Sequence, residues 1–113
     1  MRQDHPHVDQ DAGETRKEFR REAGEAFIAN LKRLRAESGL SQENLSLKAS
    51  LVRTHVGLIE KGERLPEIDT IHRLAGALGV HPGELLSGFY WRPGELGSDG
   101  KVTREPPKEQ EES

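Results

Sequence analysis

The residues between Ser50 and Gly62, SLVRTHVGLIEKG, combine donor side chains with a regular spacing. Five of them recur at i, i+1, i+4, i+5 and i+8, which places them on one face of a helix: Arg53, Thr54, Gly57, Leu58 and Lys61. Guanidinium, ammonium and hydroxyl groups donate hydrogen bonds, so this face carries the groups needed to bind acceptor atoms of a ligand. Taken alone, such charges are most often only a solvated helix surface.

Groups typical of enzymes and metal sites are missing from the sequence. There is no cysteine, which excludes disulfides, thiolate metal sites and a cysteine nucleophile. The sequence has no Gly-rich phosphate loop and no paired acid–base residues in its predicted core, so an enzyme is the weakest of the function classes considered. Four histidines have no spacing typical of metal ligands: His5, His7, His72 and His81. We expect neither a metal nor a cofactor.

The composition indicates a small protein with a thin core. Of the 113 residues, 32% are hydrophobic and 33% are charged, so part of the chain is expected to be unfolded. No apolar run approaches the roughly 20 residues that span a bilayer, and the N-terminus has no apolar signal-peptide core. We therefore expect a cytoplasmic protein with no membrane association.

The charge is distributed unevenly along the chain. The whole sequence has a net charge of −3, which by itself argues weakly against binding to nucleic acid. Residues 26–92 contain nine Lys and Arg against seven Asp and Glu, so their net charge is +2. Residues 93–113 have a net charge of −3. The middle of the chain is therefore mildly basic, and the negative total comes from the two ends.

Composition and periodicity divide the chain into three segments. Residues 1–22 are polar and are predicted to be a flexible N-terminal tail. Residues 23–88 have helical periodicity without useful strand alternation, and they are predicted to form an all-α domain. Residues 89–113 are predicted to be a C-terminal extension that begins with Phe89, Tyr90 and Trp91 and continues as a disordered acidic tail.

Apolar spacing and cap residues predict five helices. The first has its inward face at Phe27, Leu31 and Leu34, and Gly39 ends it. Ser41 is a candidate N-cap for the second helix, from Gln42 to about Ala49, with Leu45 and Ala49 inward.

A short break at residues 50–52 leads to the third helix, from about Arg53 to Lys61, with Val56 and Ile59 inward. Pro66 is predicted to open the fourth helix and Gly79 to end it. Its predicted inward residues are Ile68, Ile71, Leu74, Ala75 and Leu78. The segment from Pro82 to Leu86 is predicted to form the fifth helix.

Several short motifs follow one another in a characteristic order: Gly39-Leu40-Ser41-Gln42, Leu45, Ala49, Ile59-Glu60-Lys61-Gly62, Pro66 and Leu74-Ala75-Gly76-Ala77-Leu78-Gly79-Val80. In this order and spacing, residues 26–88 resemble the Cro/phage-repressor-type (XRE) helix-turn-helix family. The resemblance implies a compact five-helix, lambda-repressor-like domain in which the second and third helices form the helix-turn-helix.

The resemblance also implies a function. Proteins of this family are sequence-specific DNA-binding transcriptional regulators, and we expect a repressor or an autoregulator. The helix around residues 53–61 would enter the major groove of double-stranded DNA. Such regulators usually bind inverted repeats as homodimers, so a homodimer is expected here.

The family pattern assigns roles to individual residues. Arg53 would contact a base edge, commonly guanine. Leu58 and Gly57 depart from the family, which usually has polar residues at these two positions, and in a groove Leu58 would touch a thymine methyl. Thr54 would act as a helix-start residue or bond a phosphate or base, and Gly57 either removes a contact or permits closer approach. Phosphate contacts are expected from Gln42, Lys61 and Arg64.

Two further residues of the pattern are expected to be structural. The family pairs the Glu that falls at Glu60 with the Arg that falls at Arg35, and such a bridge would fix the third helix on the first. The family also usually has Gly-Leu-Ser at the turn where this chain has Ser50, Leu51 and Val52. The third helix is therefore expected to be capped by Ser50 or Thr54, with its start displaced by one or two residues. His55 is assigned mainly to packing.

Two questions stay open from the sequence. The cluster Phe89-Tyr90-Trp91 either folds back on the core or forms a patch for a dimer or partner. The alternative function is an antitoxin-like or adaptor protein, in which the helix-turn-helix is autoregulatory and the C-terminal extension binds a protein partner.

Overall fold

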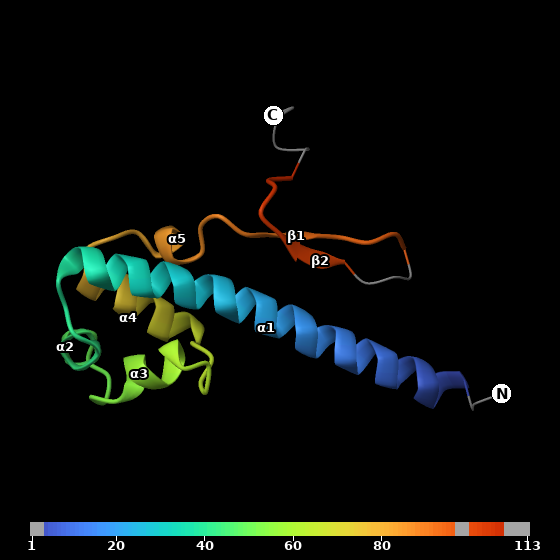
Figure 1. Cartoon of the computed structure of the whole chain (residues 1–113), viewed down its shortest axis with the longest axis horizontal. Coiled ribbons are helices and arrows are strands. Elements are labelled where there is room, and N and C mark those ends of the chain that lie inside the picture. Colours follow the sequence, from blue (N-terminus) through green and yellow to red (C-terminus); the bar gives the residue numbers. More distant parts are fainter. Residues whose placement is uncertain (1–3, 97–99, 108–113) are drawn as a thin grey trace. The chain divides into compact units, whose positions relative to one another are not determined.

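The computed structural model describes residues 4–96 and 100–107, with side chains described from residue 21 onward. This part of the chain forms five helices and one two-stranded sheet (Figure 1). In chain order these are α1 (Asp4–Ser38), α2 (Gln42–Lys48), α3 (His55–Glu60), α4 (Ile68–Leu78), α5 (Pro82–Leu85), β1 (Tyr90–Arg92) and β2 (Lys101–Thr103). None of the helices in the described part is long and apolar enough to cross a membrane.

Residues Gly24–Ser87 form a compact all-α unit. The predicted domain, residues 23–88, differs from it by one residue at each end. Helix α2 contacts both α3 and α4, and α4 contacts α5. The largest fully buried side chains come from every helix of the unit: Leu31, Leu45, Val56, Ile59, Leu74 and Leu85. The predicted inward faces of the first three helices are confirmed, because Phe27, Leu34 and Ala49 are also buried.

Helix α1 begins much earlier than the sequence predicted. Residues 4–22 were expected to be an irregular tail, but the structure continues the helix through them. In the sequence, these residues include many Glu, Arg and Lys, which have high helix propensity, and few apolar residues. A prediction based on apolar periodicity therefore missed this part of the helix. The predicted C-terminal end is confirmed, because α1 ends at Ser38 and Gly39 has a φ of 73°.

Helix α4 differs from its prediction at the start. The helix begins at Ile68, two residues after Pro66, because Glu67 still has extended backbone as the N-cap residue. Ile68 was predicted to be inward but is 74% exposed. As the first residue of the helix, it lies at the end of the face that Leu74, Ala75 and Leu78 bury in the core.

The C-terminal extension contains a hairpin that was not predicted. Strands β1 and β2 pair antiparallel, with Tyr90 opposite Thr103 and Trp91 opposite Val102. Strands of three residues are too short to show the alternation that identifies a strand in a sequence. Trp91 is half exposed. The acidic residues 108–113 lie outside the described residues.

Candidate nucleic-acid interface

The turn between α2 and α3 depends on one residue with a left-handed backbone. Ser50 has a φ of 61°, and it lies where the family usually has glycine. The Ser50 N–H donates to the Leu47 carbonyl over 3.0 Å, and the Leu51 N–H donates to the Ser46 carbonyl over 2.9 Å. These two bonds satisfy the carbonyls at the end of α2, as in a Schellman motif. The turn therefore keeps its geometry without a glycine.

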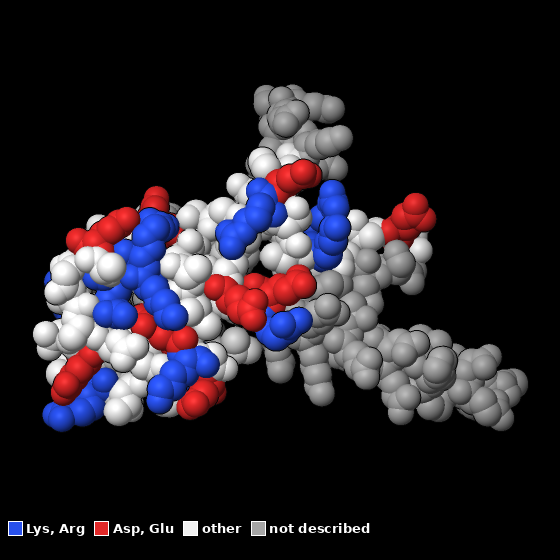
Figure 2. All heavy atoms as spheres, in the orientation of Figure 1, with Lys and Arg blue, Asp and Glu red and all other residues white. Residues whose placement is uncertain are grey.

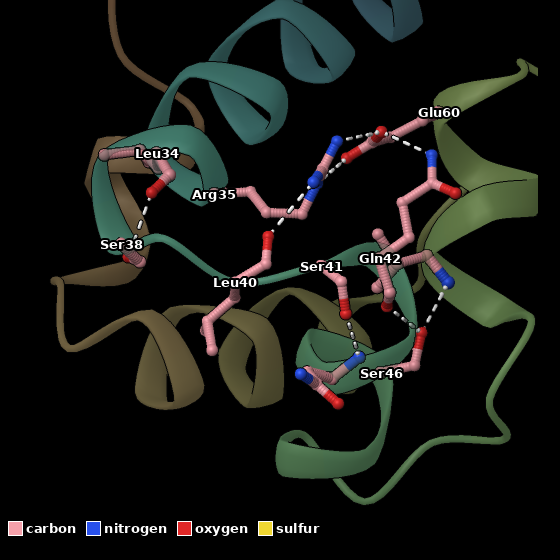
Figure 3. Close-up of polar contacts among 10 residues, drawn as sticks. Leu34, Arg35, Ser38, Leu40, Ser41, Gln42, Ser46 and Glu60 are labelled. Atoms are coloured by element: carbon pink, nitrogen blue, oxygen red, sulfur yellow. Dashed lines mark hydrogen bonds and ion pairs between the residues drawn. The ribbon is translucent and has the colours of Figure 1, made fainter.

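Helix α3 begins at His55, two residues later than predicted, and its cap comes from α2. The preceding residue, Thr54, makes no side-chain cap hydrogen bond. Instead the Val56 N–H donates to the Ser46 Oγ over 3.0 Å, and the Ser46 hydroxyl donates to the Gln42 carbonyl over 2.9 Å (Figure 3). Thr54, one of the two predicted capping residues, does occupy the N-cap position, but neither it nor Ser50 supplies the side-chain cap.

The position of Ser46 explains why it can replace a local cap. The second N–H of a helix has no partner within the helix, and Ser46 is fully buried. Its hydroxyl therefore satisfies a buried donor and joins the two helices at the point where α3 begins. The sequence did not indicate this role, because Ser46 lies nine residues before the start of α3.

The C-terminal end of α3 is fixed to α1 by a two-bond ion pair. The Arg35 Nε donates to Glu60 Oε2 over 2.8 Å, and the Arg35 Nη2 donates to Glu60 Oε1 over 2.9 Å (Figure 3). The Arg35 Nη1 also donates to the Leu40 carbonyl over 3.1 Å. The exposed fraction of the side chain is 22% for Arg35 and 3% for Glu60, so the carboxylate is shielded from water.

Gln42 joins the same network from the first residue of α2. Its Nε2 donates to Glu60 Oε1 over 2.8 Å (Figure 3). Its amide oxygen lies over Gly57, because a Cβ added at Gly57 would be 3.3 Å from the Gln42 Oε1. The structure thus shows a contact of Gln42 with α3 that was not predicted. The absence of a side chain at Gly57 leaves space for the Gln42 amide, which explains a glycine at this position by packing.

The network keeps both Arg35 and Glu60 ionised. Burial by itself would raise the pKa of the Glu60 carboxyl, but the hydrogen bonds from Arg35 and Gln42, with the charges of Arg35 and Lys32, together lower that pKa. The hydrogen bond from the Arg35 guanidinium to Glu60 raises the pKa of Arg35. Glu60 is therefore an anion at neutral pH, and its charge is directed inward to Arg35 rather than to an external ligand.

His55, the first residue of α3, is 8% exposed and therefore packs in the core. Burial lowers the pKa of its imidazole, and the positive charge of Arg64 lowers it further. The carboxylates of Glu67 and Asp69 oppose that shift. The assignment of His55 to packing agrees with this geometry.

The remaining predicted residues lie on or beside the outer face of α3. Arg53 and Thr54 precede the helix, Gly57 and Leu58 belong to it, and Lys61 and Arg64 follow it. Four of them are exposed, namely Arg53, Thr54, Lys61 and Arg64, while Gly57 and Leu58 are partly exposed. Arg53 is not isolated, because its Nη1 is 3.4 Å from Glu43 Oε2. Glu43 was not recognised from the sequence.

The charges around this face are mixed. On the side of the molecule seen in Figure 2, the basic and acidic side chains of the described residues are interspersed and do not form one patch of a single charge. Among the described residues, no group of three or more His, Asp or Glu is placed to hold a metal ion. Residues at the two ends of α3 can donate hydrogen bonds to a ligand. The buried carboxylate of Glu60 is neutralised by Arg35 of α1.

Comparison with known proteins now identifies the fold. The helix-turn-helix family HTH_3 matches residues 31–85. The uncharacterized HTH-type transcriptional regulator y4dJ of Sinorhizobium fredii is 37% identical over 59 residues, which are 52% of this chain and 77% of that protein. The chain belongs to this helix-turn-helix family.

Other proteins are also similar to part of this chain. The control protein C.BamHI of Bacillus amyloliquefaciens is 41% identical over 51 residues, which are 45% of this chain and 63% of that protein. The restriction-modification controller protein C.AhdI from Aeromonas hydrophila, which has a crystal structure, is 40% identical in sequence. It matches with a TM-score of 0.53 over 55% of this chain and 94% of that chain.

The structure of the hypothetical transcription factor NHTF from Neisseria is 31% identical. It matches with a TM-score of 0.55 over 57% of this chain and 74% of its own. Within the family fold, α2 and α3 are the two helices of the helix-turn-helix motif, and Arg35, Ser46 and Glu60 connect them to each other and to α1.

Proposed function

We propose that this protein is a sequence-specific DNA-binding transcriptional regulator, a repressor or an autoregulator, with no catalytic activity. It would insert α3 into the major groove, which is about 12 Å wide and admits one helix. The observation that carries the proposal is the contrast between the buried residues of α3 and the exposed residues just before and just after it. Val56, Ile59 and Glu60 are buried against the other helices, whereas Arg53, Thr54 and Lys61 are exposed.

The exposed residues have complementary tasks in this proposal. Arg53 would donate two hydrogen bonds to the O6 and N7 of a guanine, which discriminates against other bases by about 1–3 kcal/mol. Thr54 would bond a phosphate or a base, and Leu58 would contact a thymine methyl. Gly57 leaves the surface open between them.

Affinity without sequence preference would come from phosphate contacts. Lys61 and Arg64 follow the end of α3 and carry exposed positive charges. Gln42 would add a contact because its amide nitrogen bears a second hydrogen besides the one donated to Glu60. These contacts would fix the register of α3 on the duplex without selecting a base.

We infer that the protein acts in the cytoplasm as a homodimer on an inverted repeat. Two copies would place their α3 helices in successive major grooves, with half-sites about 34 Å apart. The names of two relatives, control protein C.BamHI and the controller protein C.AhdI, support a regulatory role. An antitoxin-like or adaptor role with a partner on the C-terminal extension is not favoured, because the similar proteins from Sinorhizobium, Bacillus, Aeromonas and Neisseria are named as regulators, control proteins or transcription factors.

The proposal is tested by selecting bound sequences from a random pool of double-stranded DNA. We expect one enriched motif for the wild-type chain. Arg53→Ala should remove the preference at one base pair per half-site, and Arg33→Ala, which removes an exposed charge from α1, should leave the motif unchanged. Lys61→Ala should weaken binding to all sequences similarly. It should also reduce the slope of log affinity against log salt concentration by about one. The absence of any enriched motif would refute the proposal.

A further inference from the structure

One exposed ion pair crosses from α2 to the turn before α3. The Arg53 Nη1 lies 3.4 Å from the Glu43 Oε2. Other exposed pairs of the compact unit, Arg33 with Glu37 and Arg73 with Asp69, join residues one turn apart on a single helix. The pair of Glu43 with Arg53 therefore differs from these in linking α2 to the turn that leads into α3.

The pair restrains the guanidinium without covering it. The exposed fraction of the side chain is 71% for Arg53 and 52% for Glu43. A guanidinium has five N–H donors, and the contact with Glu43 is made through Nη1 at 3.4 Å. Enough of its donors remain exposed to bond both the O6 and the N7 of a guanine.

Such a restraint affects what Arg53 can bind. A free arginine side chain loses rotamer freedom when a ligand immobilises it, and part of that loss is avoided when the side chain is already held. A carboxylate beside the guanidinium also repels phosphate oxygens, so it disfavours the non-specific contact that a lone arginine makes with any DNA backbone. Both effects favour a base edge over a phosphate.

We propose that Glu43 is a positioning residue that sets the base preference of Arg53. This inference rests on the proposed function, since it assigns a partner to the side chain that would contact guanine. Glu43 itself need not touch DNA. Because the pair is exposed, its contribution is limited to a factor of at most about five in an equilibrium constant.

The test compares wild type with Glu43→Gln, which keeps the size of the side chain but removes its charge. Affinity is measured for two DNA sequences. One is the selected sequence, and in the other the base pair whose preference is lost in Arg53→Ala is replaced by a different base pair. We expect the ratio of the two affinities to fall twofold to fivefold in Glu43→Gln, with a higher affinity for the replaced sequence. Glu37→Gln, which removes another exposed paired carboxylate, should leave the ratio unchanged.

A double-variant cycle separates positioning from a general effect on stability. In the Arg53→Ala background, Glu43→Gln should not change the affinity ratio, because its partner is absent. An unchanged ratio in Glu43→Gln alone would overturn the inference, and so would an equal change in both backgrounds. If wild type selects no motif at all, the proposed function fails first, so the two failures are distinguishable.

Discussion

The two helices of the helix-turn-helix are held in place by different means. Helix α2 carries its own cap, because the Ser41 Oγ accepts a hydrogen bond from the Asn44 N–H over 3.0 Å. Helix α3 has no local side-chain cap. Its first turn is bonded to Ser46 of α2, and its last residue is paired with Arg35 of α1.

This difference means that the position of α3 depends on contacts with α1 and α2 rather than on a cap of its own. A six-residue helix is marginal by itself, since most helical stability in a domain comes from tertiary packing. The side-chain hydrogen bonds that join α3 to α1 and α2 come from residues that precede it in the chain, and they do not involve the exposed side chains of Thr54 and Lys61. Substitutions in α1 or α2 should therefore disturb DNA binding, although those residues need not touch DNA.

The largest expected effect is from Arg35→Met. It leaves the Glu60 carboxylate buried without its cation, which costs about 3 kcal/mol in the free energy of unfolding and releases the end of α3. Chemical denaturation measures the loss, and DNA affinity should fall with it.

Two controls accompany this variant. Arg33→Met, on the exposed side of α1, should change stability by less than about 0.5 kcal/mol. The double variant Arg35→Met with Glu60→Leu should recover much of the loss, because it removes both charges. A stability of Arg35→Met equal to that of wild type would show that the pair does not hold α3.

The next effect compares the two caps directly. Ser46→Ala leaves the buried Val56 N–H without an acceptor and should cost about 2 kcal/mol. Ser41→Ala removes an exposed local cap and should cost about 1 kcal/mol. Hydrogen exchange of the Val56 amide should accelerate more in Ser46→Ala than in Ser41→Ala. The reverse order would mean that α3 does not depend on α2 for its cap.

A smaller effect, of opposite sign, is expected at the turn. Ser50→Gly should raise the free energy of unfolding by about 0.5 to 1 kcal/mol, because glycine adopts the left-handed conformation without the steric cost that serine bears. Ser87→Gly, an exposed position outside this turn, should not stabilise the protein. If Ser50→Gly destabilises instead, the left-handed backbone assigned to this turn is incorrect.

The smallest effect expected is on the pH dependence of stability. The pKa of His55 is lowered in the folded state from an ordinary value of 6.5, mainly by burial and by Arg64, so the unfolded chain binds its proton more readily. Stability from this group is complete above about pH 6.5 and declines as the pH falls through the lowered value. His55→Gln should flatten the curve in that window.

Glu60 acts in a separate window. Its lowered folded pKa gives stability that is present above its ordinary value of 4.5 and is lost as the pH falls further. Thermal unfolding measured from pH 7 down to about pH 2 covers both windows and distinguishes the two groups. A wild-type curve that stays flat between pH 6.5 and 5 would contradict the assignment for His55.

Much of the compact unit could be predicted from the sequence. Apolar periodicity and end signals located its five helices, and the family pattern led to the pair of Arg35 and Glu60 that the structure contains. The N-terminal half of α1 could not be found in this way, because a polar helix has no apolar period. The hairpin was missed because its strands have three residues each.

The supports of α3 were harder to predict than the fold. A cap is sought among the residues just before a helix, whereas Ser46 acts from nine residues before the start of α3 and only in the folded unit. The contact of Gln42 with Glu60 likewise joins separate helices, and that of Glu43 with Arg53 joins α2 to the turn before α3. Their partners depend on how those helices pack, which spacing along the chain does not specify.

The most direct measurement uses the absence of cysteine in the chain. A DNA-cleaving iron chelate is attached to Thr54→Cys, at the start of α3, and in a second variant to Gly76→Cys, at an exposed position of α4 with open space around it. On the selected DNA, we expect strong cleavage within each half-site from residue 54 and little from residue 76. Equal cleavage from both positions, or stronger cleavage from residue 76, would contradict the placement of α3 in the major groove.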